Sequence, residues 1–124
     1  MRNHIKPCHL ILLILLLTSC ATSMTPVEMT SNLKTMTKSK FMTQAEAQEA
    51  VSSNTCRYLT KGRDYVAPVG FTVKDDLRFA ANGIDEWVQL DGGNAYVLNS
   101  YFWATIDEDG STQLHIRFDT LLCE

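Results

Sequence analysis

The sequence predicts a small α+β domain at residues 43–124, in which one long amphipathic helix packs on a small antiparallel sheet. Two observations predict this fold class. Apolar residues recur with the 3.6-residue period of a helix between Val73 and Val88. Apolar and polar residues alternate over 111–122, as in a strand with one covered face. A helix and a sheet that are each apolar on one side bury those sides against each other.

Local signals predict the first elements of this domain. Thr43 and Glu46 fit a capping box, which starts a short helix over 44–52. Residues 55–67 carry β-branched and aromatic side chains and predict a strand, bulged at Gly62. The domain therefore begins with a short helix followed by a strand.

Similar signals predict the second half. Thr72 caps the long helix, which ends at the Asp-Gly-Gly of 91–93. A strand over 94–106 and the last strand over 111–122 flank a turn at 107–110. The β-α-β-β core thus ends in a long hairpin. In the last strand one face carries Thr112, Leu114, Ile116, Phe118, Thr120 and Leu122, and the other carries Gln113, His115, Arg117 and Asp119.

The first residues have the three parts of an export signal. Arg2 and Lys6 are positive, and residues 10–17 form an apolar run that is followed by two small residues. The run is shorter than the roughly 20 apolar residues that cross a bilayer, which favours a cleaved signal over a membrane span.

Residues 17–20, Leu-Thr-Ser-Cys, resemble the lipobox of bacterial lipoproteins, whose cysteine is acylated and becomes the first residue of the mature chain. The resemblance implies a signal peptide at 1–19 and lipidation of Cys20, with acyl chains that anchor the protein in a membrane. Ala21 follows the cysteine where some lipoproteins have Asp, which implies the outer membrane, facing the periplasm. The alternative is an ordinary signal peptide whose cleavage site includes a cysteine.

The charge of the chain argues against nucleic acid as a partner. Removal of residues 1–19 takes away Arg2 and Lys6, which leaves 9 basic residues of 11 against 14 acidic ones. The formal charge changes from −3 to −5. Nucleic acid requires a basic surface, so we expect no nucleic-acid partner.

Cysteine counting suggests one disulfide. If Cys20 is acylated and Cys8 is removed with the signal, Cys56 and Cys123 remain. In an oxidising envelope such a pair is typical of a disulfide, although free thiols or bridges between chains are alternatives. The mature chain has a single histidine, His115, and no closely spaced cysteine pair, so we expect no metal site and no cofactor.

Residues 20–42 are predicted to be the lipid anchor and a flexible tether. They are rich in Thr, Ser, Met and Lys and show no sustained apolar period. Alternatively, Met24, Met29 and Met36 form a stripe that binds a partner.

The segment 56–123 resembles the small bacterial envelope lipoproteins related to RcsF, the outer-membrane stress sensor of the Rcs pathway, and sister families without assigned function. A strand opens with Cys (CRYLTKG), a helix follows (DDLRFAANGIDEWVQL), a Gly-Asn turn leads to a strand (GGNAYVL), and the last strand ends in Cys. The resemblance implies the architecture and the outer-membrane location. The stress sensor has four domain cysteines and this domain has two, so the resemblance does not carry signalling over.

The residues do not suggest catalysis. His115 and Asp119 lie on one strand face about 13 Å apart, beyond hydrogen-bond distance, and the acidic turn at 107–109 lacks the spread of ligands in a calcium loop. We expect no enzyme. An aromatic cluster suggests a partner-binding surface, because residues 101–103 are consecutive and some must face outward. The candidates are Trp87, Tyr96, Tyr101 and Trp103.

These observations predict a non-enzymatic lipoprotein that binds a protein partner in the cell envelope, as a sensor or assembly accessory. The alternative is an anchored inhibitor of an envelope-attacking enzyme such as lysozyme. Both functions need a small, disulfide-linked domain close to a membrane.

Overall fold

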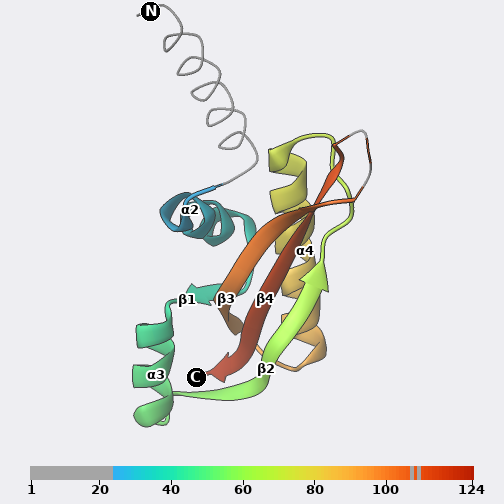
Figure 1. The fold of residues 1–124 in the computed structure, drawn as a ribbon. Helices are drawn as coiled ribbons and strands as arrows, with labels where there is room; N and C mark the ends of the chain where they lie inside the picture. Colours follow the sequence, from blue (N-terminus) through green and yellow to red (C-terminus); the bar gives the residue numbers. More distant parts are fainter. Residues whose placement is uncertain (1–23, 107, 109) are drawn as a thin grey trace, which may run out of the picture.

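A computed structural model describes residues 24–106, 108 and 110–124 of the protein. It shows an α+β domain with a four-stranded mixed sheet. The elements are helix α2 (Pro26–Met36), strand β1 (Lys40–Met42), helix α3 (Gln44–Ser52), strand β2 (Cys56–Val66), helix α4 (Val73–Leu90), strand β3 (Ala95–Thr105) and strand β4 (Thr112–Cys123). The strand order is β1-β3-β4-β2, with α4 behind the sheet in the view of Figure 1. The predicted fold class is confirmed. The predicted signal peptide at 1–19 and the lipidation site Cys20 lie outside the described residues.

The predicted local signals hold in the structure. Thr43 and Glu46 form both halves of the capping box of α3. The Thr72 hydroxyl caps α4 by accepting the N–H of Asp75. The register of β2 against β4 shifts between Thr60 and Arg63, on either side of Gly62, where φ is +70°. A left-handed backbone of this kind favours glycine, which explains why the bulge forms there.

The predicted tether is wrong from residue 26 onward. Thr25 caps α2, and Pro26 stands in its first turn, where a missing N–H costs nothing. Met29 and Leu33 of this helix are completely buried in the core, which contradicts the alternative of a methionine stripe exposed to a partner. The chain then forms β1, which pairs in parallel with residues 95–97 of β3.

A carboxylate of α4 fixes the connection between α2 and β1. The backbone N–H groups of Lys38 and Ser39 donate to the two oxygens of Asp85 at 2.8 and 2.9 Å. The parallel pair also corrects the expected all-antiparallel sheet. Strands β2 and β3 each pair antiparallel with β4, and β1 adds a parallel edge strand next to β3.

The main core lies between the sheet and the two helices α2 and α4. Leu114, Ile116 and Phe118 of β4 face it, as the alternation predicts. On α4, Gly83 lets β2 approach closely, because a Cβ atom there would stand 2.2 Å from the ring of Tyr65. The buried residues of this core are Met29, Leu33, Ala67, Leu77, Ala80, Ala81, Ile84, Val88, Tyr96, Leu114, Ile116 and Phe118.

A second, smaller core lies on the opposite face of the sheet, near α3. It contains Met42, Ala47, Cys56, Ala95, Val97 and Leu121. The disulfide between Cys56 and Cys123 closes this end of the sheet, where the two residues are cross-strand partners. The predicted disulfide is therefore confirmed. The prediction that Asp119 lies on the uncovered face of β4 is wrong. That face is covered at its α3 end, where Asp119 is buried together with Leu121.

Candidate functional site

The structure places the predicted partner-binding aromatics in or against the main core. Tyr96 is completely buried, and its hydroxyl shares a 3.0 Å hydrogen bond with that of Thr37. Phe41 packs edge-on against its ring. Burial raises the pKa of Tyr96 to about 12. A ring without exposed surface offers nothing to a partner, so the prediction for Tyr96 is wrong.

The other three predicted residues are half-buried, and each has a contact within the domain. The Tyr101 hydroxyl donates to the carbonyl of Met24 at 2.7 Å. The Trp103 indole donates to Asp76 at 3.1 Å. The guanidinium of Arg63 lies 3.9 Å from the ring centre of Trp87. These contacts position structural elements, and a role of Tyr101, Trp103 and Trp87 in partner binding stays a prediction.

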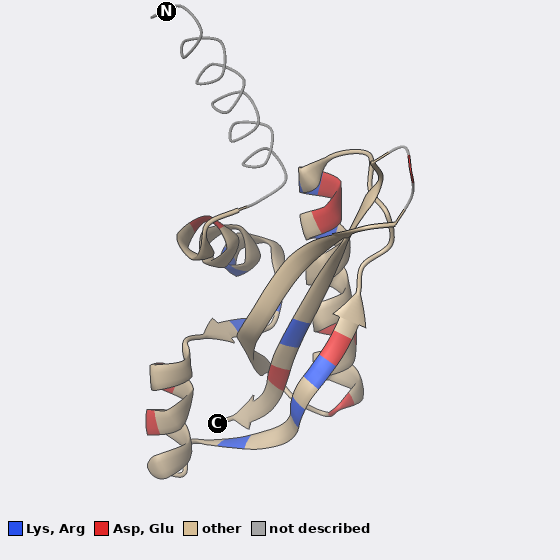
Figure 2. Cartoon of the chain, viewed as in Figure 1, with Lys and Arg blue, Asp and Glu red and all other residues tan. Residues whose placement is uncertain are grey.

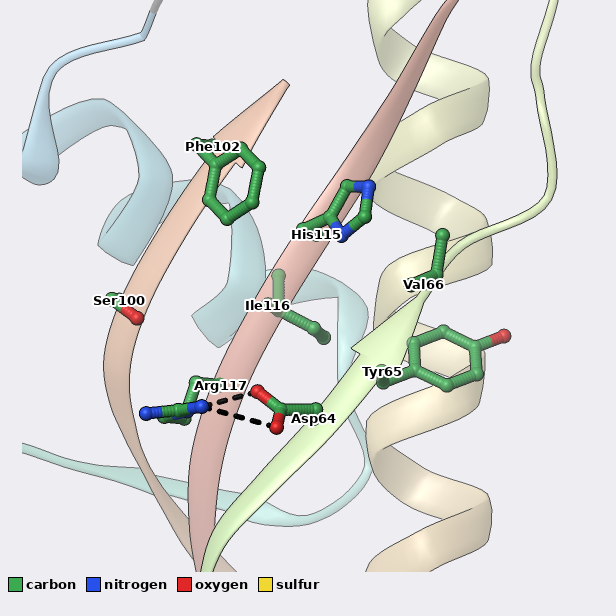
Figure 3. A pocket seen from close by; sticks show the side chains of 8 residues that line it. All are labelled: Asp64, Tyr65, Val66, Ser100, Phe102, His115, Ile116 and Arg117. Atoms are coloured by element: carbon green, nitrogen blue, oxygen red, sulfur yellow. Dashed lines mark hydrogen bonds and ion pairs between the residues drawn. The ribbon is translucent and has the colours of Figure 1, made fainter. Parts of the chain in front are cut away.

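The surface that remains open is the half of the outer sheet face that α3 leaves uncovered. We call it the open sheet face and define it by the side chains of Asp64, Val66, Ser100, Phe102, His115 and Arg117. The cross-strand register aligns them in two rows. One row is Phe102, His115 and Val66, and the other is Ser100, Arg117 and Asp64. These six side chains line a hollow of about 400 Å³. Figure 3 shows how they lie on the three strands.

The first row is apolar and open to solvent. Phe102 stacks on His115 with 4.6 Å between ring centres and 12° between ring planes. Its side chain is 57% exposed, and that of Val66 on the other side of His115 is 43% exposed. Cross-strand neighbours of this kind stabilise each other through side-chain contact. The row therefore presents a flat aromatic surface with an imidazole that can stack and hydrogen-bond.

The second row is charged. Arg117 donates to both carboxylate oxygens of Asp64, at 2.8 and 3.1 Å. These hydrogen bonds lower the pKa of Asp64 and raise the pKa of Arg117. Both side chains are exposed, so the pair adds little to stability but gives the hollow a polar rim. Charged residues of both signs lie along this part of β2 and β4 (Figure 2).

Two bulges bound the open sheet face on the side of α3. Asn99 is the extra residue in β3, where the register shifts between Leu98 and Ser100. Its side-chain amide donates to Asp119 at 2.8 Å, and its carbonyl accepts from Gln44 of α3 at 2.8 Å. The N–H of Gly62, in the bulge of β2, donates to the same Asp119 oxygen. Asp119 therefore holds both bulges and closes the lower edge of the face.

This surface combines exposed apolar side chains with a charged pair. Among residues 24–106, 108 and 110–124, no group of three or more His, Cys, Asp or Glu side chains is placed to hold a metal ion. Both cysteines of the described part are joined in the disulfide. His115 has an aromatic ring and a valine as its row neighbours. Protein interfaces have an apolar core and a polar rim, and this face places an apolar row beside a charged one.

None of the helices that the structure describes combines the length and the apolar character of a transmembrane span. No protein-family model, curated protein or solved structure matches the chain.

Sequence reasoning identified part of this face. The alternation of β4 predicted that His115 and Arg117 face away from the core. The consecutive aromatics at 101–103 predicted outward rings with Tyr101 and Trp103 as candidates, whereas the exposed ring is that of Phe102. Asp64, Val66 and Ser100 were missed. Their positions depend on the register of β2 and β3 against β4, and two bulges set that register. The Asp64–Arg117 pair can be predicted only after β2 has been aligned with β4.

Proposed function

We propose that this chain is a lipid-anchored protein of the bacterial envelope that binds a protein partner through the open sheet face and catalyses no reaction. Cys20 carries the acyl chains, and the outer membrane facing the periplasm is the location. The partner is another envelope protein, and the role is that of a sensor or assembly accessory, similar to the RcsF-related lipoproteins. The lipobox at residues 17–20 supports the anchor and the location.

The observation that carries the proposal is the uncovered stack of Phe102 on His115. The same sheet face is covered by α3 at its other end, where Val97 and Leu121 are buried. A sheet face that bears a large exposed ring and an exposed valine gains free energy when a partner removes that surface from water. The Asp64–Arg117 rim adds orientation, because charged groups at an interface edge favour one register of docking.

The first test identifies what covers this face in intact cells. A photoreactive phenylalanine analogue is introduced at Phe102, and at Gln48 as a control. Gln48 is exposed on α3, away from the open sheet face. We expect one discrete adduct with an envelope protein from position 102 and none from position 48. Identical adduct patterns from both positions would contradict the proposal.

The second test measures the energetic contribution of the stack. In a purified complex with the captured partner, Phe102→Ser and His115→Ala should each weaken binding about tenfold or more, the effect of losing an interface hot spot. Because Phe102 is 57% exposed and the stack is one cross-strand contact, each variant should lower the thermal midpoint only slightly and stay folded during the binding measurement. Capture of added lysozyme by the same face would replace the proposed partner with the inhibitor alternative.

The anchor has its own test. Replacement of the acylated thiol in Cys20→Ser should abolish labelling with radioactive fatty acid and move the protein out of the membrane fraction. A protein that stays in the membrane fraction without label would exclude lipidation as the means of attachment.

A further inference from the structure

One end of the domain presents apolar side chains to solvent in two neighbouring loops. We define the tip as Val69, Phe71, Val73 and Ile106, all of which are exposed. The first three lie in the β2–α4 connection and the first turn of α4, and Ile106 follows β3. A hollow lined by Val69, Phe71 and Val73 also includes Ser111 and Thr112, so the two loops lie side by side. In Figure 1 they occupy the upper end, opposite α3 and the C-terminus.

Contacts with the first turn of α4 hold the loop of the tip in place. The N–H of Gly70 donates to Asp76 at 2.9 Å, and a Cβ atom on Gly70 would stand 2.7 Å from that carboxylate. The loop is therefore held tightly against the first turn of α4. Its apolar neighbours Val69 and Phe71 consequently stay outside, and Phe71 is fully exposed.

A chain of contacts connects the tip to the point where the N-terminal segment enters the domain. The buried carboxylate of Asp76 accepts from the Trp103 indole at 3.1 Å as well as from Gly70. Trp103 packs edge-on against Tyr101 with 6.2 Å between ring centres. The Tyr101 hydroxyl donates to the carbonyl of Met24 at 2.7 Å. Only three side chains therefore separate Met24 from the loop that carries Phe71.

The length of chain before Met24 limits how far the tip can lie from a membrane. Cys20 precedes Met24 by four residues, which span at most about 14 Å when fully extended. With the acyl chains of Cys20 in a bilayer, Met24 lies within that distance of the lipid surface. Because α2 belongs to the folded domain, the segment between Cys20 and Met24 is the whole tether between the acyl chains and the domain that carries the tip.

We propose that the tip inserts Phe71 and its apolar neighbours into the surface of the bilayer that holds the acyl chains of Cys20. This inference rests on the lipidation in the proposed function and adds a second contact between protein and membrane. Apolar insertion drives it, because the charges beside the tip are mostly acidic: residues 107–109 are Asp-Glu-Asp. Lys74 and Glu108 are exposed, and Asp75 pairs with Arg78 at 3.0 Å. A second contact fixes the domain's orientation, with α3 pointing away from the membrane.

The test uses the full lipidated protein in vesicles. In the mature chain the remaining thiols are acylated at Cys20 or joined between Cys56 and Cys123, so an introduced cysteine is the single reactive one. Phe71→Cys carries an environment-sensitive dye, and Gln48→Cys at the opposite end is the matched control. The vesicles are of phosphatidylcholine, with brominated acyl chains as quencher and with phosphatidylglycerol added in a second series.

We expect the dye at position 71 to emit at shorter wavelength and to be quenched severalfold more than the dye at position 48, in both lipid series. Equal quenching at the two positions, with the protein still bound to vesicles, would overturn the insertion of the tip and leave the lipid anchor intact. A protein that does not float with the vesicles would instead show that lipidation itself fails. The two failures are therefore distinguishable.

Crosslinking in cells tests whether phospholipid or a protein contacts the tip. A photoreactive side chain at position 71 should form adducts with phospholipid. A discrete protein adduct, or an adduct with a second copy of the chain, would overturn the proposal. Because Phe71 is fully exposed, neither substitution disturbs the core, and an unchanged thermal midpoint confirms this.

Discussion

The backbone N–H of Gly62 donates a 2.8 Å hydrogen bond to the carboxylate of Asp119, so that a bulge in the edge strand β2 is held by a buried side chain of its neighbour β4. The same oxygen accepts the amide of Asn99 from the bulge in β3. One carboxylate therefore sets the register of β4 against both of its neighbours. The alignment of the open sheet face depends on it.

Removal of this carboxylate should destabilise the domain. Asp119→Ala leaves the donors of Gly62 and Asn99 without their acceptor, and we expect the free energy of unfolding to fall by about 3 kcal/mol, as for two hydrogen bonds to a charged group. Urea denaturation measures this. The control is Asp64→Ala, which removes an exposed ion pair and should change stability by less than about 0.5 kcal/mol. Equal effects would contradict the role of Asp119.

Acid should weaken the contact between β2 and the end of α4. The hydrogen bonds from Arg63 hold the pKa of Asp91 below its usual range, and Thr120 adds another at 2.8 Å. A lowered pKa in the folded state gives stability that is present above the unfolded value, near pH 4, and is lost as the pH falls through the folded value. We expect a loss of about 2 kcal/mol at low pH.

The variant Asp91→Asn isolates this contribution. It should lower stability at neutral pH and flatten the acid dependence of unfolding, measured by urea titrations from about pH 6 to about pH 2. A variant whose acid dependence equals that of the parent would assign the effect to other carboxylates.

Alkali should destabilise the fold through Tyr96. Its pKa is raised to about 12 by burial, whereas an unfolded tyrosine ionises near pH 10. Between about pH 10 and about pH 12 the unfolded chain has lost a proton that the folded chain keeps. The free energy of unfolding therefore falls by up to ~1.4 kcal/mol per pH unit.

Tyr96→Phe removes this step and Tyr58→Phe, at a half-buried ring, is its control. Unfolding monitored across alkaline pH should be less steep for the first variant only. If both variants keep the parent's steepness, Tyr96 is not the group responsible.

The helix α2 should contribute to the stability of the whole domain. Leu33→Ala removes a completely buried side chain, and we expect a loss of about 3 kcal/mol in one cooperative transition. Ser31→Ala, exposed on the same helix, should leave stability within about 0.5 kcal/mol of the parent. If the two variants are equally stable, residues 26–36 do not belong to the core.

The sequence predicts those elements that carry their own signals. The capping box at Thr43, the period of α4 and the alternation of β4 are local. Each appears in the structure where it was expected, except that the alternation of β4 ends before Asp119. The pairing of Cys56 with Cys123 followed from counting thiols. In each case the residues that specify the element lie within it, or their number leaves few choices.

The missed elements depend on distant residues. Met29 and Leu33 stand four positions apart on one helix face, and Thr25-Pro26 is a helix start, but this short stripe among polar residues resembles a linker. Strand β1 has three residues and exists because β3 pairs with it. The open sheet face needed three aligned strands and two bulges. Periodicity within one segment contains no information about such pairings.

The position of β4 also determines when the sheet can form. Strand β2 pairs with β4 and with no other described strand, yet 45 residues separate Val66 from Thr112 in the order of synthesis. Cys56 likewise waits for its partner 67 positions later. During synthesis, β2 therefore has no strand to pair with until β4 has been made. Under the proposed export, the sheet and the disulfide are therefore completed together, after translocation, in the compartment where thiols are oxidised.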